Sequence, residues 1–299
     1  MNTPSNLVGI LSEQDLFDWL KIKPRTLDWD ALVVYDRLKA NQLLLSEYIG
    51  RFTGESYFKP LTAQVLISEG ETRTWEYLFD QVLDAPRLSF ENSDIGDSLA
   101  RFTMQILGGV QMSVEQPPNA PKRVTKVEWF DPLQGPKLVA GIRLEDTDGS
   151  VSEDGRVKLD LSKGMDFELT FASTYHARTE GGKLYKQLFE RLDDHQKVFV
   201  LNTLESFDEG EYLDPDKFRI RAFPAIPSRS EGELASQHGA ILVLVAGKGS
   251  PSGHLPDDDM EWVYPIPTGR SSTVLFSNSV LMRKLIAMGM KYSPYTFSD

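Results

Sequence analysis

The chain has 299 residues, of which 40% are hydrophobic and 25% charged, a composition typical of a globular protein with a sizeable core. Its formal net charge is −12, because 44 Asp and Glu residues outnumber 32 Lys and Arg residues. Nucleic-acid binding is not expected, since it requires a basic face. The absence of cysteine excludes disulfides and thiolate chemistry.

The start of the chain predicts two helices. Residues 1–25 are interpreted as a helical extension in which Ser12 is a suitable N-cap and Pro24 marks the end. Residues 27–52, LDWDALVVYDRLKANQLLLSEYIGRF, predict one long central helix that is apolar on two sides. One stripe contains Trp29, Leu32, Val33, Ala40, Leu43 and Leu44, and the other contains Val34, Leu38, Leu45, Ile49 and Phe52. Such a helix must be covered on two sides.

Residues 57–299 predict mainly strands joined by turns, with two further helices near 183–195 and 272–290. LARFTMQILGG and MDFELTFAS alternate strictly between apolar and polar residues, as half-buried strands do. The order of elements predicts an α+β fold, with residues 1–299 as a single domain. Because long antiparallel sheets twist and coil, we expect a highly curved sheet wrapped around the central helix.

No segment carries a secretory signal or could cross a membrane. MNTPSNLVGILSEQ has no basic region followed by an apolar run, and the apolar runs AILVLVAG and LVVY are too short for a bilayer. We therefore expect synthesis in the cytoplasm, with any release by an unconventional route.

Patterns typical of enzymes and metal sites are also missing. GSPSG has proline where a G-x-S-x-G nucleophile would stand, and AGKGS lacks the spacing of a phosphate-binding loop. The histidines have no zinc-ligand spacing, and the acidic stretch DTDGSVSEDG places glycine at the fourth rather than the sixth position of a calcium loop. We expect a non-enzymatic protein without metal or cofactor. The four histidines are His176, His195, His238 and His254.

The expected wrap leaves an elongated apolar seam between helix and sheet. A gap in this seam would hold a lipid chain or another hydrophobic molecule, whereas complete packing would make it ordinary core. Trp29 and Asn41 are interpreted as structural, with the Asn41 amide bonded to strand backbone. The candidate ligand-binding residues are Leu32, Val33, Ala40, Leu44, Phe102, Met104, Phe167 and Phe171.

Three stretches resemble the OrfX/p-forty-seven family of clostridial neurotoxin gene clusters. In DWDALVVYDRLKANQLL the matching positions are Trp29, Asp30, Val33 and Asn41, while Asp28 stands where that family often has glycine. PRLSFENSDIGDSLARFTMQILGG and LNTLESFDEGEYLDPDKFRIR resemble two later landmarks. The resemblance implies a tubular lipid-binding (TULIP) fold in bacterial, toxin-associated proteins that are not enzymes. Its members often carry paired modules, and lipid binding has been proposed for them.

Two functions are consistent with these patterns. The first is binding of a lipid or other hydrophobic ligand in the seam. The second is a protein-interaction or scaffold component of a complex, with a filled core and partners encoded by neighbouring genes. The acidic loops at 145–155 and 256–261 favour the second. Whether the seam is hollow or filled separates the two, and residue patterns alone do not decide it.

Overall fold

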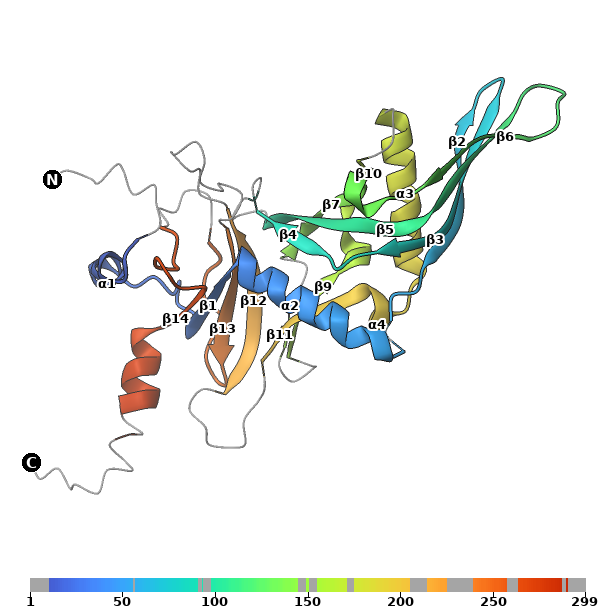
Figure 1. The fold of residues 1–299 in the computed structure, drawn as a ribbon. Helices are drawn as coiled ribbons and strands as arrows, with labels where there is room; N and C mark the ends of the chain where they lie inside the picture. The colour runs from blue at the N-terminus through green and yellow to red at the C-terminus, as the bar shows by residue number, and fades with distance from the viewer. Residues whose placement is uncertain are drawn as a thin grey trace, which may run out of the picture.

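Antiparallel strands make up most of the regular secondary structure that is described, in two large sheets and a separate pair (Figure 1). The fold is mixed α+β, and one of its sheets is strongly curled. The computed structural model describes residues 11–55, 57–90, 93, 98–144, 149–150, 155–170, 175–204, 214–224, 239–256, 263–286 and 289.

The first sheet has five strands in the order β14-β1-β13-β12-β8. Both of its faces are covered, which explains why the apolar run AILVLVAG of β13 is buried along its whole length. Val243 packs in the main core on one face, and Leu242 packs in a second core on the other. The strands are β14 (Ser272–Phe276), β1 (Ala31–Asp36), β13 (Ala240–Gly247), β12 (Pro215–Phe223) and β8 (Gly149–Ser150).

The second sheet has seven strands, with the path β10-β7-β5-β3-β2 and with β4 and β6 each paired to the long strand β5. Its strands are β10 (Met165–Leu169), β7 (Lys137–Arg143), β5 (Leu99–Gln116), β3 (Arg73–Leu83), β2 (Leu61–Glu69), β4 (Arg87–Ser89) and β6 (Arg123–Trp129). The separate pair consists of β9 (Arg156–Asp160) and β11 (Val198–Thr203).

No helix in the described part of the chain is long and apolar enough to cross a membrane. The α-helices are α1 (Glu13–Ile22), α2 (Arg37–Gly50), α3 (Tyr175–Arg191) and α4 (Asp194–Lys197). The 3-10 helices are η1 (Arg51–Thr53), η2 (Pro132–Gln134) and η4 (Leu161–Lys163), and η6 (Val280–Ile286) is a π-helix.

The predicted single helix over residues 27–52 is wrong. Residues Ala31–Asp36 form β1, which lies between β13 and β14, and the helix α2 begins only at Arg37. The run ALVVY is rich in β-branched and aromatic residues, which favour a strand. Val33 faces the main core and Leu32 faces the second core. The apolar pattern on two sides therefore reflects a strand buried on both faces, followed by a helix.

A curled sheet does enclose a helix, but that helix is α3 and not the predicted N-terminal one. α3 contacts both β10 and β2, the first and last strands on the path of the seven-stranded sheet (Figure 1). Two glycines inside α3 permit this close approach. A Cβ atom on Gly182 would overlap the backbone oxygen of Phe167, and one on Gly181 would overlap the side chain of Leu169.

The two helices predicted later in the chain have different outcomes. The helix predicted near 183–195 is present as α3. It begins earlier than predicted, at Tyr175, so Gly181 and Gly182 lie within it. The helix predicted near 272–290 is wrong in its first part, because Ser272–Phe276 pairs with β1 as strand β14. Helical structure follows only in η6.

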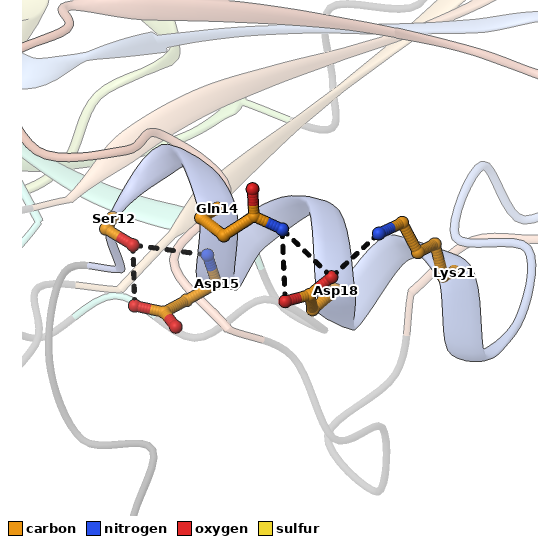
Figure 2. Close-up of polar contacts among 5 residues, drawn as sticks. All are labelled: Ser12, Gln14, Asp15, Asp18 and Lys21. Atoms are coloured by element: carbon orange, nitrogen blue, oxygen red, sulfur yellow. Dashed lines mark hydrogen bonds and ion pairs between the residues drawn. The ribbon is translucent and has the colours of Figure 1, made fainter.

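Helix α1 begins at the N-cap predicted from the sequence (Figure 2). The Ser12 hydroxyl accepts a hydrogen bond from the Asp15 backbone N–H at 3.2 Å and donates one to the Asp15 carboxylate at 2.6 Å. Asp18 accepts from Gln14 at 3.1 Å and pairs with Lys21 at 2.8 Å. The Lys21 ammonium and the Gln14 amide lower the pKa of the Asp18 carboxyl. These exposed contacts stabilise α1 only modestly.

We predict that Gly182→Ala destabilises the protein, because the added methyl group meets backbone that cannot rotate away. Overpacking of this kind costs about 1–3 kcal/mol of unfolding free energy. Gly50→Ala is the matched control, since Gly50 is also helical and a Cβ there would have no neighbour within 4 Å. It should stabilise the protein by about 0.5–1 kcal/mol. Urea unfolding measures both, and equal effects would contradict this account.

Candidate functional site

Most of the predicted ligand-binding residues lie together in the main core. Leu44, Phe102 and Met104 are 0% exposed, and the rings of Phe102 and Phe167 meet edge to face with 5.7 Å between their centroids. These side chains contact other side chains instead of water. The residues in or packed against the main core are Val33 on β1, Ala40 and Leu44 on α2, Phe102 and Met104 on β5, and Phe167 on β10.

The remaining two predicted ligand-binding residues are not found in the main core among the described residues. Leu32 lies in the second core, on the other face of the five-stranded sheet. Phe171 lies outside the described residues. The strand character of β1 separates Leu32 from Val33, because successive side chains on a strand point to opposite faces.

Asn41 joins α2 to the seven-stranded sheet. Its side-chain amide donates to the Leu88 carbonyl at 3.0 Å, and the Leu88 N–H donates to its amide oxygen at 2.7 Å. Leu88 is the middle residue of β4, whose other edge pairs with β5. The Asn41 side chain therefore occupies the position of a further strand and fixes α2 beside the edge of β4.

Trp29 is 1% exposed in the second core, and its indole N–H donates to the backbone oxygen of His254 at 2.7 Å. It follows a tight turn in which Leu27 and Asp28 have φ angles of 52° and 64°. Glycine is the residue that adopts this left-handed conformation without strain, whereas Leu27 and Asp28 adopt it with side chains. The turn directs the indole toward the loop that contains His254.

The outer side of α2 carries a second apolar stripe that the core does not cover. Leu38, Leu45, Ile49 and Phe52 are 63%, 41%, 56% and 51% exposed. They are spaced at intervals that bring side chains to one helical face, although Phe52 already belongs to η1. At 1.5 Å per residue the stripe is about 21 Å long. We call these four residues the outer stripe.

A groove of about 470 Å³ lies between the outer stripe and strands β4 and β5. Leu38 and Leu45 form part of its lining, and Arg37, Arg87 and Lys137 provide positive charge. Among the described residues that line it there is no carboxylate. Arg87 pairs with Asp84 at 3.4 Å, but its side chain remains largely exposed. The groove is thus apolar along part of its wall and basic overall, in a chain of net charge −12.

A second surface lies on the ribbon formed by β2, β3, β6 and the later half of β5, which projects from the body of the molecule (Figure 1). Residues directly opposite each other in antiparallel strands share one face. The pairing of β3, β5 and β6 places nine of their apolar residues on such a face, and we call these nine the ribbon face. They are Trp75, Tyr77 and Phe79 of β3, Val110, Met112 and Val114 of β5, and Val124, Val127 and Trp129 of β6.

The ribbon face is exposed along β6. Trp129 is 76% exposed, Val124 and Val127 are each 55% exposed, and Phe79 is 38% exposed. The rings of Tyr77 and Phe79 stack with 6.3 Å between centroids. The alternation in KVEWF predicts a strand, and it also indicates that Val127 and Trp129 share a face. It cannot show that this face meets water, because a core-facing strand has the same pattern.

The opposite face of the ribbon is polar where the ribbon leaves the body. Glu76 accepts hydrogen bonds from the Ser113 hydroxyl at 2.8 Å and from the Gln111 amide at 3.0 Å. Leu78, which is paired with Gln111, belongs to the main core. The exposed apolar surface is therefore confined to one side of the ribbon.

Among the described residues, the titratable side chains offer no cluster of metal ligands. No group of three or more His, Asp or Glu residues in this part of the chain could hold a metal ion. Burial raises the pKa values of Tyr35, Tyr185 and Tyr264 above their ordinary range. Their hydroxyls stay protonated at neutral pH, and that of Tyr185 donates to Gln81 at 3.1 Å.

Two solved structures are similar to this chain. P47 from Clostridium botulinum A2 aligns with a TM-score of 0.43 and 13% identity, and P47 of Clostridium botulinum E1 aligns with a TM-score of 0.42 and 11% identity. Each alignment covers 86% of this chain and 53% of the P47 chain, so the chain spans about half the length of either protein. No protein-family model matches the chain, and no curated protein matches it. At these TM-scores the likeness carries no functional argument, and the TULIP assignment stays a prediction.

We predict that Asn41→Ala lowers the free energy of unfolding by about 1–3 kcal/mol, because it leaves the N–H and C=O groups of Leu88 without their partner. Gln42→Ala is the control, because Gln42 also lines the groove and should change stability by less than about 0.5 kcal/mol. Urea unfolding of the two variants tests this. Equal midpoints would show that Asn41 does not hold α2 against β4.

We predict that Trp29→Ala lowers the free energy of unfolding by about 3–5 kcal/mol, since it removes a large buried side chain. Trp29→Phe keeps an aromatic ring but loses the hydrogen bond to His254, so its cost should be smaller. Guanidinium unfolding measures both variants. A negligible shift of the midpoint for Trp29→Ala would mean that the indole is solvent-exposed in solution.

Proposed function

We propose that this chain is a non-enzymatic interaction protein that docks a partner protein through the ribbon face. The exposure of Trp129, with two valines beside it on the same projecting strand, is the observation that carries the proposal. A monomer seldom leaves a contiguous apolar patch in water unless something binds there. Tryptophan and tyrosine are enriched at protein interfaces and dominate their binding energy.

The ribbon face suits a protein partner better than a membrane. The net charge of −12 opposes adhesion to anionic lipid surfaces. The face is also built on paired strands, so side chains such as Tyr77 and Phe79 are already ordered by their stacking. Ordering before binding lowers the entropic cost of association.

Lipid binding in the seam is the second candidate and stays a prediction. The described seam residues support it less well, because Leu44, Phe102 and Met104 are completely buried against other side chains. The toxin association implied by the family resemblance likewise stays a proposal. If it holds, the products of neighbouring genes are the first partners to examine.

Affinity purification of the chain with each neighbouring gene product tests the docking proposal. We predict that one of these proteins is retained stoichiometrically by the wild type and lost from the double variant Trp129→Ala, Val127→Ala. The control is Lys126→Ala, on the same strand but opposite Ser113 and therefore on the polar face. It should retain the partner, because an exposed charge outside the patch contributes little.

Two results would contradict the docking proposal. One is retention of the same partner by the double variant at wild-type level. The other is sedimentation of the wild type with neutral phosphatidylcholine vesicles that depends on Trp129, because this would make the ribbon face a membrane-binding surface. Far-UV circular dichroism of each variant confirms that the strands remain folded.

A further inference from the structure

The groove beside α2 shares no residue with the ribbon face, and its lining combines apolar and basic side chains. Its apolar wall belongs to the outer stripe, which continues past the groove to Ile49 and Phe52. Asn41 holds the two sides of the groove together, because its side chain bonds α2 to the backbone of β4. The groove is therefore a fixed feature of the surface between two packed elements.

The charges of the groove oppose those of the chain as a whole. Arg37, Arg87 and Lys137 all line it, and no Asp or Glu does so among the described residues. Lys137 forms no side-chain ion pair within the part of the chain that the structure describes, whereas Arg87 pairs with Asp84 at 3.4 Å and Arg37 interacts electrostatically with the Asp36 carboxylate. Three cations around an apolar wall attract a ligand that is both acidic and apolar.

The geometry of the outer stripe indicates the shape of this ligand. Side chains at Leu38, Leu45, Ile49 and Phe52 follow one helical face over about 21 Å, the length of roughly 14 helical residues. A single lipid chain is usually enclosed by its site over most of its surface, whereas this groove is open to solvent beside an exposed helix. An amphipathic helix packs along such a stripe through residues spaced three, four and seven apart.

We propose that the groove docks an acidic amphipathic helix of a partner protein. The apolar side chains of that helix pack on Leu38 and Leu45, and its carboxylates pair with Arg37, Arg87 and Lys137. This site is independent of the ribbon face, so the chain presents two docking surfaces of different chemistry.

Fluorescence anisotropy with synthetic peptides tests the proposal. The probes are three fluorescein-labelled helices of about 16 residues, which differ in sequence but share leucines on one face and glutamates on the other. Each has two controls, a scrambled peptide of the same composition and a version in which lysine replaces glutamate. We expect at least one acidic amphipathic helix to bind, and its affinity to fall as salt is raised from about 50 to about 300 mM.

Charge reversal locates the binding. The double variant Arg87→Glu, Lys137→Glu should weaken the affinity by about tenfold or more, because two attractions become repulsions. The matched control is Arg123→Glu, Lys126→Glu, which changes the net charge equally but lies on β6, outside the groove. Leu45→Ser tests the apolar wall and should also weaken binding. Circular dichroism and thermal melting establish that each variant is folded.

Several outcomes would overturn the proposal: no binding by any of the three acidic helices, equal binding by the scrambled peptides, or equal weakening by the two double variants. Binding of anionic phosphatidylglycerol vesicles that the groove variants abolish, without peptide binding, would identify a lipid site instead. Trp129→Ala should leave peptide affinity unchanged, so failure of this proposal is distinguishable from failure of the ribbon-face proposal.

Discussion

Helix α2 can bury only one of its two apolar sides, because it is held at both ends and in its middle. Asp36 ends β1 and caps the helix by accepting from the Lys39 N–H at 2.7 Å. Asn41 fixes the middle to β4. At the far end the buried Arg51 guanidinium donates to the backbone oxygens of Gln196 and Val198. These contacts direct one stripe of α2 into the core and leave the outer stripe in water.

The seven-stranded sheet imposes the second constraint. It curls around α3, whose paired glycines allow backbone contact with β10. Its later part leaves the body where β3 carries an extra residue between Phe79 and Val82. Opposite this bulge, Gly109 has a φ of 118° that a larger residue would rarely adopt. Beyond this point the side opposite Leu78 and the main core meets solvent at Phe79 and along β6, whereas Trp75 and Val114 on that side are buried.

Residue patterns predict the fold class and many of the strands correctly. The predictions are wrong where tertiary packing, and not the local residue pattern, determines the secondary structure. The strict alternation around Phe102 and Met104 identified a half-buried strand correctly, because burial on one face produces a period of two. ALVVY followed by a helical run was read as one helix, since a strand buried on both faces has no polar side to reveal its period. The helix predicted near 183–195 begins earlier, at Tyr175, and includes Gly181 and Gly182, which let α3 approach β10.

The candidate surfaces were harder to predict than the core. The outer stripe was recognised as a second apolar side, yet only the three-dimensional fold shows that water covers it. The ribbon face needs the register of three strands, which brings Trp75, Met112 and Trp129 to one side. Nothing in a single sequence specifies these pairings. Exposed apolar residues at functional surfaces therefore resemble core residues until their neighbours are known.

Native mass spectrometry of the purified chain, combined with solvent extraction and lipid profiling, tests most directly whether function resides on the surface. If the seam is packed in solution as it is around Leu44, Phe102 and Met104, the protein has the mass of the polypeptide alone and the extract contains no stoichiometric lipid. A retained lipid or other hydrophobic molecule at one per chain would contradict the account and favour a hollow seam.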